Sequence, residues 1–230
     1  GGITIFSSSM LDNSDFSSGA FPAEYGDAIS GVFDMRFRKG NKEKDQYTFK
    51  AGVIGLDFSA EGPFKKGQSS YLVNYRYSTL GILNALGFHL TDEREDNTFQ
   101  DLSFNLNFPS KNNRSVFNVW GIGGLSNEDY DAIDDVNKWD EYDDYAIYDF
   151  KTNMGAAGIG HSLQIGKNGL LKTSLAIMDQ KITYVDDTLN SQKAPYTIND
   201  ELYKNRRLSL AVSYSTKLAS AVAWKTGAFV

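Results

Sequence analysis

The chain has 230 residues, no cysteine and a formal net charge of −6. Without cysteine it has no disulfide framework and no thiolate metal site. The negative charge argues against a nucleic-acid partner, which would need a basic surface. Hydrophobic residues make up 41% and aromatic residues 13%, with 21 glycines and only 4 prolines. This composition excludes a disordered chain and favours antiparallel strands joined by turns.

The first 45 residues alternate turns with short strand patterns. A short strand is predicted for residues 1–9, and a second for Val32 to Arg38, where apolar and polar residues alternate. A charged break follows at residues 39–45. Three glycines are predicted to lie in turns: Gly19, Gly26 and Gly31.

A run of clear strand patterns follows. Between residues 47 and 61 the phase of the alternation flips, so we place a tight turn at Gly55 and favour two short strands. Residues 69–79 and 101–108 alternate strictly and are predicted strands. The long connection at residues 80–97 begins with LGILNALGFH, for which we expect one or two helical turns.

The rest of the chain continues as strands, which we expect at 115–126, 150–165, 170–185, 201–215 and 221–230. Long loops are predicted at 127–149 and 186–199. Short turns are predicted at 62–68, 109–114, 166–169 and 216–220. Alternating short and long connections are typical of an up-and-down barrel in an outer membrane. The pattern yields about nine strands, and both ends of the sequence look cut in mid-strand, so we interpret it as a fragment.

Two runs of sequence resemble a known family. GAFPAEYGDAISGVFDMRFRKGN (19–41) and GLDFSAEGPFKKGQSSYLVNYRYS (55–78) resemble the end of the plug domain and the first barrel strands of a TonB-dependent outer-membrane receptor of the Bacteroidetes type. The resemblance implies an all-β chain: an antiparallel up-and-down transmembrane β-barrel, preceded by the C-terminal part of a plug domain. Residues 1–40 would belong to the plug and residues 41–230 to the barrel, which the nine strands leave incomplete.

The resemblance also implies a function. Such a receptor binds an external substrate and imports it through the plugged barrel of the bacterial outer membrane, and it is not an enzyme. Its energy comes from a TonB-type protein, through an N-terminal segment that this sequence lacks. Outer-membrane lipid would surround the barrel, and a surface lipoprotein is a further candidate partner. Siderophore complexes, vitamins, glycans and peptides all fit as substrates.

Charged residues are candidates for contacts between plug and barrel. Those in the plug would pair with charges facing the lumen, although strand ion pairs are as often plain structural features. The candidates are Glu24, Asp34, Arg36, Arg38 and Arg76.

The acidic and aromatic loop at 127–149 is the richest candidate binding site. Rings that could stack on a sugar or a peptide are Tyr130, Trp139, Tyr142 and Tyr145. Carboxylates that could bind Ca²⁺ are Asp131, Asp134, Asp135 and Asp140, followed by Asp143 and Asp144. The spacing does not match an EF-hand, and a solvated loop is the competing interpretation. No other cofactor is expected.

Aromatic residues in the strands have a different predicted place. We expect an aromatic girdle or lipid-facing position for Tyr71, Tyr75, Tyr77, Tyr148, Tyr184 and Tyr214. No serine-hydrolase or zinc-peptidase motif occurs, so no catalytic residue is predicted. The alternative function is a secreted or surface-exposed all-β glycan-binding protein. A porin fits the strands but leaves the glycine-rich segment unexplained.

Overall fold

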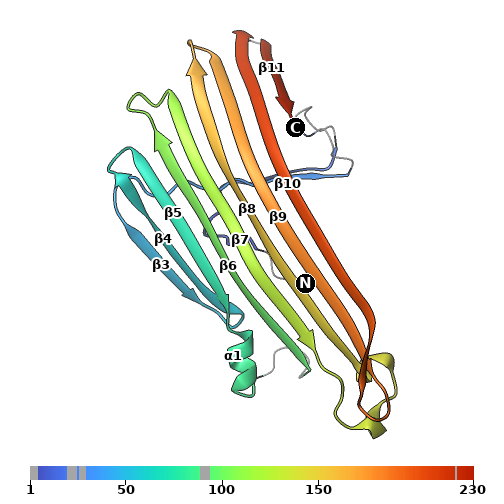
Figure 1. Cartoon of the computed structure of the whole chain (residues 1–230). Coiled ribbons are helices and arrows are strands. Elements are labelled where there is room, and N and C mark those ends of the chain that lie inside the picture. Colours follow the sequence, from blue (N-terminus) through green and yellow to red (C-terminus); the bar gives the residue numbers. More distant parts are fainter. Residues whose placement is uncertain (1–4, 20–24, 26–29, 89–93, 221) are drawn as a thin grey trace.

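The protein is all-β, as the sequence predicts. In the computed structural model the described residues are 5–19, 25, 30–88, 94–220 and 222–230. Within them, nine strands form one antiparallel sheet in the order β11-β10-β9-β8-β7-β6-β5-β4-β3. Each strand therefore pairs with its neighbours in the chain, as an up-and-down meander does (Figure 1). No helix among these residues is long and apolar enough to cross a membrane.

The strands lengthen from β5 to β10. Their bounds are β3 Gln46–Ala51, β4 Gly55–Lys65, β5 Ser69–Ser78, β6 Glu95–Pro109, β7 Ser115–Tyr130, β8 Ala146–Ile165, β9 Gly169–Leu189, β10 Pro195–Ala219 and β11 Val222–Phe229. A separate pair is β1 Asp15–Ser17 with β2 Val32–Asp34. The helical elements are α1 Leu80–Ala85, η1 Val136–Lys138 and η2 Tyr142–Asp144.

The turn near Gly55 is confirmed. Strand β3 ends at Ala51, and its pairing with β4 starts with Ala51 opposite Leu56. The N–H of Gly52 donates a hydrogen bond of 3.0 Å to the carbonyl oxygen of Gly55. The predicted helical turn in the connection after β5 is also confirmed, as α1.

The prediction of a long loop at 186–199 is wrong. Strands β9 and β10 continue through it, and only residues 190–194 turn. The loop at 127–149 shortens in the same way, to 131–145. The polar side chains in both stretches suggested loops. Strands pair through hydrogen bonds between main-chain groups, however, and these bonds do not require apolar side chains. The strict alternation of long and short connections is therefore not observed.

The N-terminal segment, residues 5–41, has less strand structure than predicted. Residues 5–9 form no strand, and residues 1–4 lie outside the described part. Only Val32–Asp34 of the predicted strand 32–38 is regular, because its partner β1 has three residues. A single bridge, Leu11 with Phe37, continues the pairing. Gly26 also lies outside the described residues.

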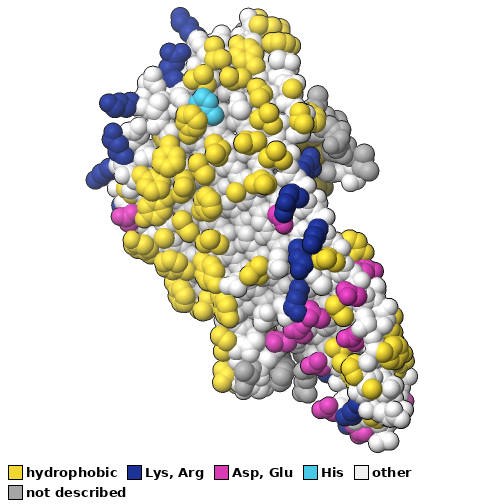
Figure 2. Space-filling view, viewed as in Figure 1, with side chains coloured by type: hydrophobic (Ala, Val, Ile, Leu, Met, Phe, Trp, Pro, Cys, Tyr) yellow, Lys and Arg dark blue, Asp and Glu magenta, His cyan; other side chains and the backbone are white. Residues whose placement is uncertain are grey.

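The two faces of the large sheet differ sharply in chemistry. Cross-strand pairs such as Phe58 with Tyr75 and Ile177 with Leu208 place apolar side chains on one side, the apolar face (Figure 2). Many of these side chains are exposed, among them Leu102 at 47% and Leu175 at 46%. The opposite side, the polar face, carries buried residues: Ser59, Ser70, Asn74, Asp101, Ser103, Asn105 and Asn107.

The N-terminal segment covers part of the polar face. It passes behind the sheet in Figure 1 and contacts strands β3 to β7. Burial of the polar residues on those strands follows from this cover.

Candidate functional site

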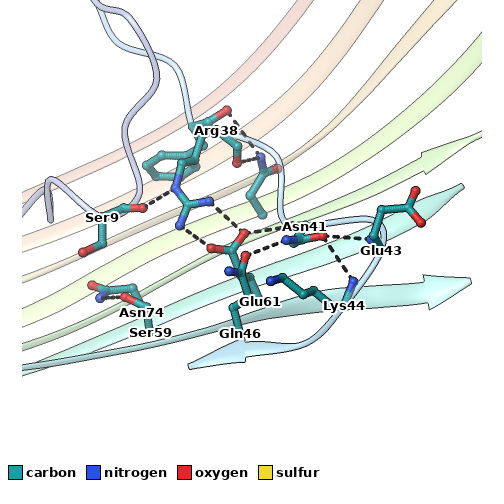
Figure 3. A network of polar contacts seen from close by, with 11 residues as sticks. Ser9, Arg38, Asn41, Glu43, Lys44, Gln46, Ser59, Glu61 and Asn74 are labelled. Atoms are coloured by element: carbon teal, nitrogen blue, oxygen red, sulfur yellow. Dashed lines mark hydrogen bonds and ion pairs between the residues drawn. The ribbon is translucent and has the colours of Figure 1, made fainter. Parts of the chain in front are cut away.

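A bidentate ion pair holds the N-terminal segment on the polar face. Both terminal nitrogens of the Arg38 guanidinium donate to the Glu61 carboxylate of β4, each at 2.8 Å (Figure 3). The third donor, Nε, reaches the carbonyl oxygen of Ser9 at 2.7 Å. Glu61 also accepts the N–H of Asn41 at 2.8 Å. Paired hydrogen bonds of this kind fix orientation as well as distance.

A second set of hydrogen bonds lies beside this pair. The Ser7 hydroxyl donates to the Asp57 carboxylate at 2.8 Å, and Asn74 donates to the same carboxylate at 2.6 Å. Farther along the sheet, the Asn105 side chain donates to the carbonyl oxygen of Arg38 at 2.8 Å. Buried polar groups of the sheet are thus satisfied partly by the N-terminal segment.

Gly40 allows the two backbones to approach closely. A Cβ atom at Gly40 would lie 1.9 Å from the carbonyl oxygen of Tyr71 on β5. Any side chain would therefore force the N-terminal segment away from the sheet.

Aromatic contacts complete the attachment. The ring of Phe37 lies 6.3 Å from that of Trp120 on β7 and 6.4 Å from that of Phe6, centre to centre. Trp120 in turn needs Gly158 on β8, where a Cβ would come within 2.8 Å of the indole ring. The bulky ring is accommodated because its cross-strand neighbour has no side chain.

A cavity of about 1060 Å³ lies between residues 32–37 of the N-terminal segment and the polar face. Phe33 and Arg36 line it from the segment, and Asn118, Trp120 and Ser174 line it from the sheet. The segment is therefore attached to the sheet at particular residues and stands off it where the cavity lies.

The predicted contact residues have different fates. Arg38 does contact the sheet, through Glu61, which the sequence reasoning missed. Asp34 and Arg36 instead pair with each other at 2.6 Å, and this guanidinium lowers the pKa of the Asp34 carboxyl. Arg76 pairs at 2.7 Å with Asp101 on the adjacent strand. Glu24 lies outside the described residues.

The four aromatic candidates of the loop come together at the projecting end, where β7 to β10 extend beyond the apolar face (Figure 1). The rings of Trp139 and Tyr142 each lie within 5.6 Å of Tyr145. Tyr130 lies 5.6 Å from Tyr148, which is 6.5 Å from Tyr142. The rings thus pack against one another as a cluster that is only partly buried, with Tyr142 39% exposed.

Polar contacts fix this cluster further. The indole N–H of Trp139 donates to the carbonyl oxygen of Ile133 at 2.8 Å, and the guanidinium of Arg94 lies 4.8 Å from the Tyr130 ring centre. Tyr142 donates its hydroxyl to Asp186 at 2.9 Å. Burial and this bond raise the pKa of Tyr142 to about 12, so the hydroxyl stays protonated at neutral pH.

The acidic candidates are dispersed. Asp135 caps η1 by accepting the N–H of Asn137 at 3.1 Å, and Asp134 lies 3.9 Å from the Lys193 ammonium. Asp140 donates its own N–H to Asp144 at 2.8 Å. In the part of the chain that the structure describes, no three acidic or histidine side chains, Asp131 included, converge as a metal site.

The strand tyrosines divide between the faces. The cross-strand register places Tyr71, Tyr75, Tyr77 and Tyr214 on the apolar face, in line with expectation. Tyr148 and Tyr184 lie on the opposite side of the sheet, which corrects their predicted lipid-facing position. They join the aromatic cluster instead, stacked with their centres 6.3 Å apart.

Comparison with known proteins identifies no relative. A scan against protein-family models, a search of curated proteins and a search of solved structures each find no match to this chain. Its function must therefore be argued from the two faces of the sheet and from the segment between them.

Proposed function

We propose that this chain contributes the end of the plug and part of the barrel wall to a TonB-dependent outer-membrane receptor. In this proposal further strands close the barrel, and the receptor imports an external substrate with energy from a TonB-type protein. Outer-membrane lipid contacts the apolar face, and a surface lipoprotein is a candidate partner. The protein is a transporter and not an enzyme.

The observation that carries the proposal is the reversal of burial. Among the described residues, 5 hydrophobic side chains are buried, against 11 polar or charged ones. Soluble proteins bury apolar side chains and rarely expose a large continuous apolar patch. A transmembrane barrel does the opposite, because lipid covers its outer face and the lumen is polar. The apolar face of the sheet fits the lipid side of such a wall.

The dimensions of the apolar face support the same proposal. On β7 it runs from Phe117 to Leu125, which are about half exposed. Eight residue steps span about 27 Å along a strand, or about 19 Å across a membrane at a tilt of 45°. The apolar band of known barrels is about 25 Å tall. The longer strands β8 to β10 would then project from the membrane surface.

The attachment of the N-terminal segment supports the proposal that this segment is the end of a plug. It is bound to the polar face by Arg38 and Ser7, and the cavity lies between residues 32–37 and the sheet. A segment placed inside a barrel in this way would block the lumen.

Ion conductance of the full-length protein in planar bilayers tests the proposal. The full-length protein should insert and conduct little, and deletion of residues 1–40 should open a steady pore. The protein should fold only in detergent before it inserts. Folding is measured on a gel, where the mobility of the folded protein should change after boiling. A full-length protein that folds without detergent and does not insert contradicts the proposal, and the glycan-binding alternative then replaces it.

A further inference from the structure

Basic side chains lie at the edge of the apolar face that is nearest to the projecting end. Where β9 pairs with β10, the last apolar pair is Ile177 with Leu208. The next pairs on the same face are Asp179 with Arg206 and then Lys181 with Lys204. Figure 2 shows Lys and Arg side chains in a row between the apolar area and the acidic projecting end.

The two lysines of this row form an unfavourable pair. Lys181 and Lys204 are directly opposite each other and exposed, and neither has an ion-pair partner among the described residues. Like charges placed directly opposite on neighbouring strands destabilise a sheet. A bound anion would offset this repulsion.

The neighbouring ion pairs do not neutralise the row. Arg206 pairs with Asp179 at 2.7 Å, and Lys151 on β8 pairs with Asp149. Charges within each of these two pairs cancel, and Asp129, opposite Asp149 on the same face, adds one negative charge beside Lys151. Lys181 and Lys204 therefore still leave the row with an excess of positive charge. We call Lys151, Lys181, Lys204 and Arg206 the basic rim.

The depth of the basic rim matches that of lipid headgroups. Arg206 lies two residues beyond Leu208, and Lys181 lies four residues beyond Ile177. At about 3.4 Å per residue and a tilt of 45°, these positions are about 5 and 10 Å above the apolar edge. The headgroup layer occupies about 5 to 8 Å on each side of the hydrocarbon core, and lysine side chains bend toward it.

We propose that the basic rim binds the phosphate-bearing headgroup of a membrane lipid whose acyl chains lie on the apolar face below it. The inference rests on the proposed function, because it needs the apolar face to be in a bilayer. Lysine binds phosphate as a point charge, and clustered Lys and Arg at a membrane surface attract anionic lipids. Acyl chains and headgroup would thus contact one continuous surface of β8 to β10.

Lipid selection by the full-length protein tests the inference. The protein is inserted into phosphatidylcholine nanodiscs with or without phosphatidic acid, and lipids that remain bound after mild detergent extraction are counted by native mass spectrometry. Phosphatidic acid should be enriched around the protein. The double variant K181Q/K204Q should lower its apparent affinity by about 10- to 30-fold, from about three- to fivefold per lysine.

A matched control removes the same charge at the same end. In K138Q/K193Q two lysines of the projecting end are replaced, and the enrichment should persist. Equal enrichment in both double variants overturns the inference, as does enrichment that inorganic phosphate in solution abolishes, since that marks a free-anion site. Insertion into phosphatidylcholine without lipid selection overturns the inference alone, whereas failure to insert overturns the proposed function.

Discussion

The two faces of the same sheet follow opposite rules of burial. On the apolar face, Leu102 and Leu175 are about half exposed, although water would exclude them. On the polar face, Asn74 and Ser103 are completely buried. The strands are the same, and only the parity of the residue number changes from one face to the other.

This difference indicates that the two faces have different surroundings. Burial of a polar side chain is costly unless it has hydrogen-bond partners, and the N-terminal segment supplies some of them, as with Asn105 and the Arg38 carbonyl. The hydroxyl oxygen of Ser103 is buried without such a partner among the described residues. Exposed leucines are stable only in an apolar environment. The comparison therefore separates an observed protein contact on one side from a proposed lipid contact on the other, and substitutions can test the two sides independently.

The largest effect is expected where the N-terminal segment meets the polar face most closely. Gly40→Val would place a Cβ 1.9 Å from the Tyr71 carbonyl oxygen and should cost about 3 kcal/mol or more of attachment energy. Limited proteolysis of the full-length protein should then cut residues 5–40 rapidly. Gly19→Val is the control, since nothing lies within 4 Å of its Cβ position, and equal protection of both variants would contradict the contact.

A charge on each face should have unequal consequences for stability. Leu175→Arg places a cation in the lipid band and should destabilise the inserted protein by about 2–4 kcal/mol. Ser174→Arg, one residue away on the cavity side, should cost less than about 1 kcal/mol. Denaturant titrations in lipid vesicles measure both. If Leu175→Arg is tolerated or stabilising, the apolar face does not contact lipid.

The ion pair to Glu61 should matter more than the pair within the N-terminal segment. Arg38→Met leaves a partly buried carboxylate with fewer donors and should cost about 1–3 kcal/mol. Arg36→Met breaks an exposed pair and should cost less than Arg38→Met, because solvent screens the pair. Proteolytic protection of residues 5–40 reports both, and a larger loss with Arg36→Met would refute this ranking.

The smallest effect is expected in the loop at 131–145. Hydrogen bonds from the N–H groups of Glu141 and Asp140 lower the pKa of Asp144 below 3.8. A carboxylate with a lowered pKa stabilises the fold above its unfolded pKa, and this contribution disappears as the pH falls through the folded value. Acidification below about pH 4 should therefore loosen the loop before the sheet.

Hydrogen exchange of this loop, corrected for its intrinsic pH dependence, measures the change. In the Asp144→Asn variant the amide hydrogens of the loop should exchange a few-fold faster at neutral pH. In the Asp134→Asn variant, which changes a fully exposed side chain, they should exchange as in the parent chain. Identical exchange in the two variants would show that the carboxylate bonds do not order the loop.

The sequence predicts the alternation of faces well, because parity is a local property. It correctly places Tyr75 and the apolar residues between Leu102 and Phe108 on one face. It also predicts the turn before Gly55. It misplaces the ends of β9 and β10, because polar residues such as Asp186 and Asn199 still pair across the ladder. Hydropathy marks where a strand leaves an apolar environment, and not where it ends.

The candidate site was less predictable than the fold. Arg38 was expected to contact the barrel, but its partner Glu61 is 23 residues away and is brought there only by the path of the N-terminal segment. Tyr148 was assigned to the wrong face because its strand was predicted to start only at residue 150. Tyr184 lies within the predicted strand 170–185, and its even number already places it on the face opposite to Leu175 and Ile177. Parity could therefore have corrected Tyr184, whereas the face of Tyr148 depends on pairing beyond the predicted strand end.

Site-directed spin labelling along β9 tests the central claim most directly. The chain has no cysteine, so a single introduced cysteine at each position from 171 to 178 carries a unique nitroxide. For the full-length protein in lipid vesicles, collision with oxygen should dominate at Leu171, Thr173, Leu175 and Ile177. Collision with a water-soluble nickel complex should be relatively stronger at the even-numbered positions between them. This period of two is the expected result, and uniform access of the nickel complex along both faces would contradict a lipid-facing wall.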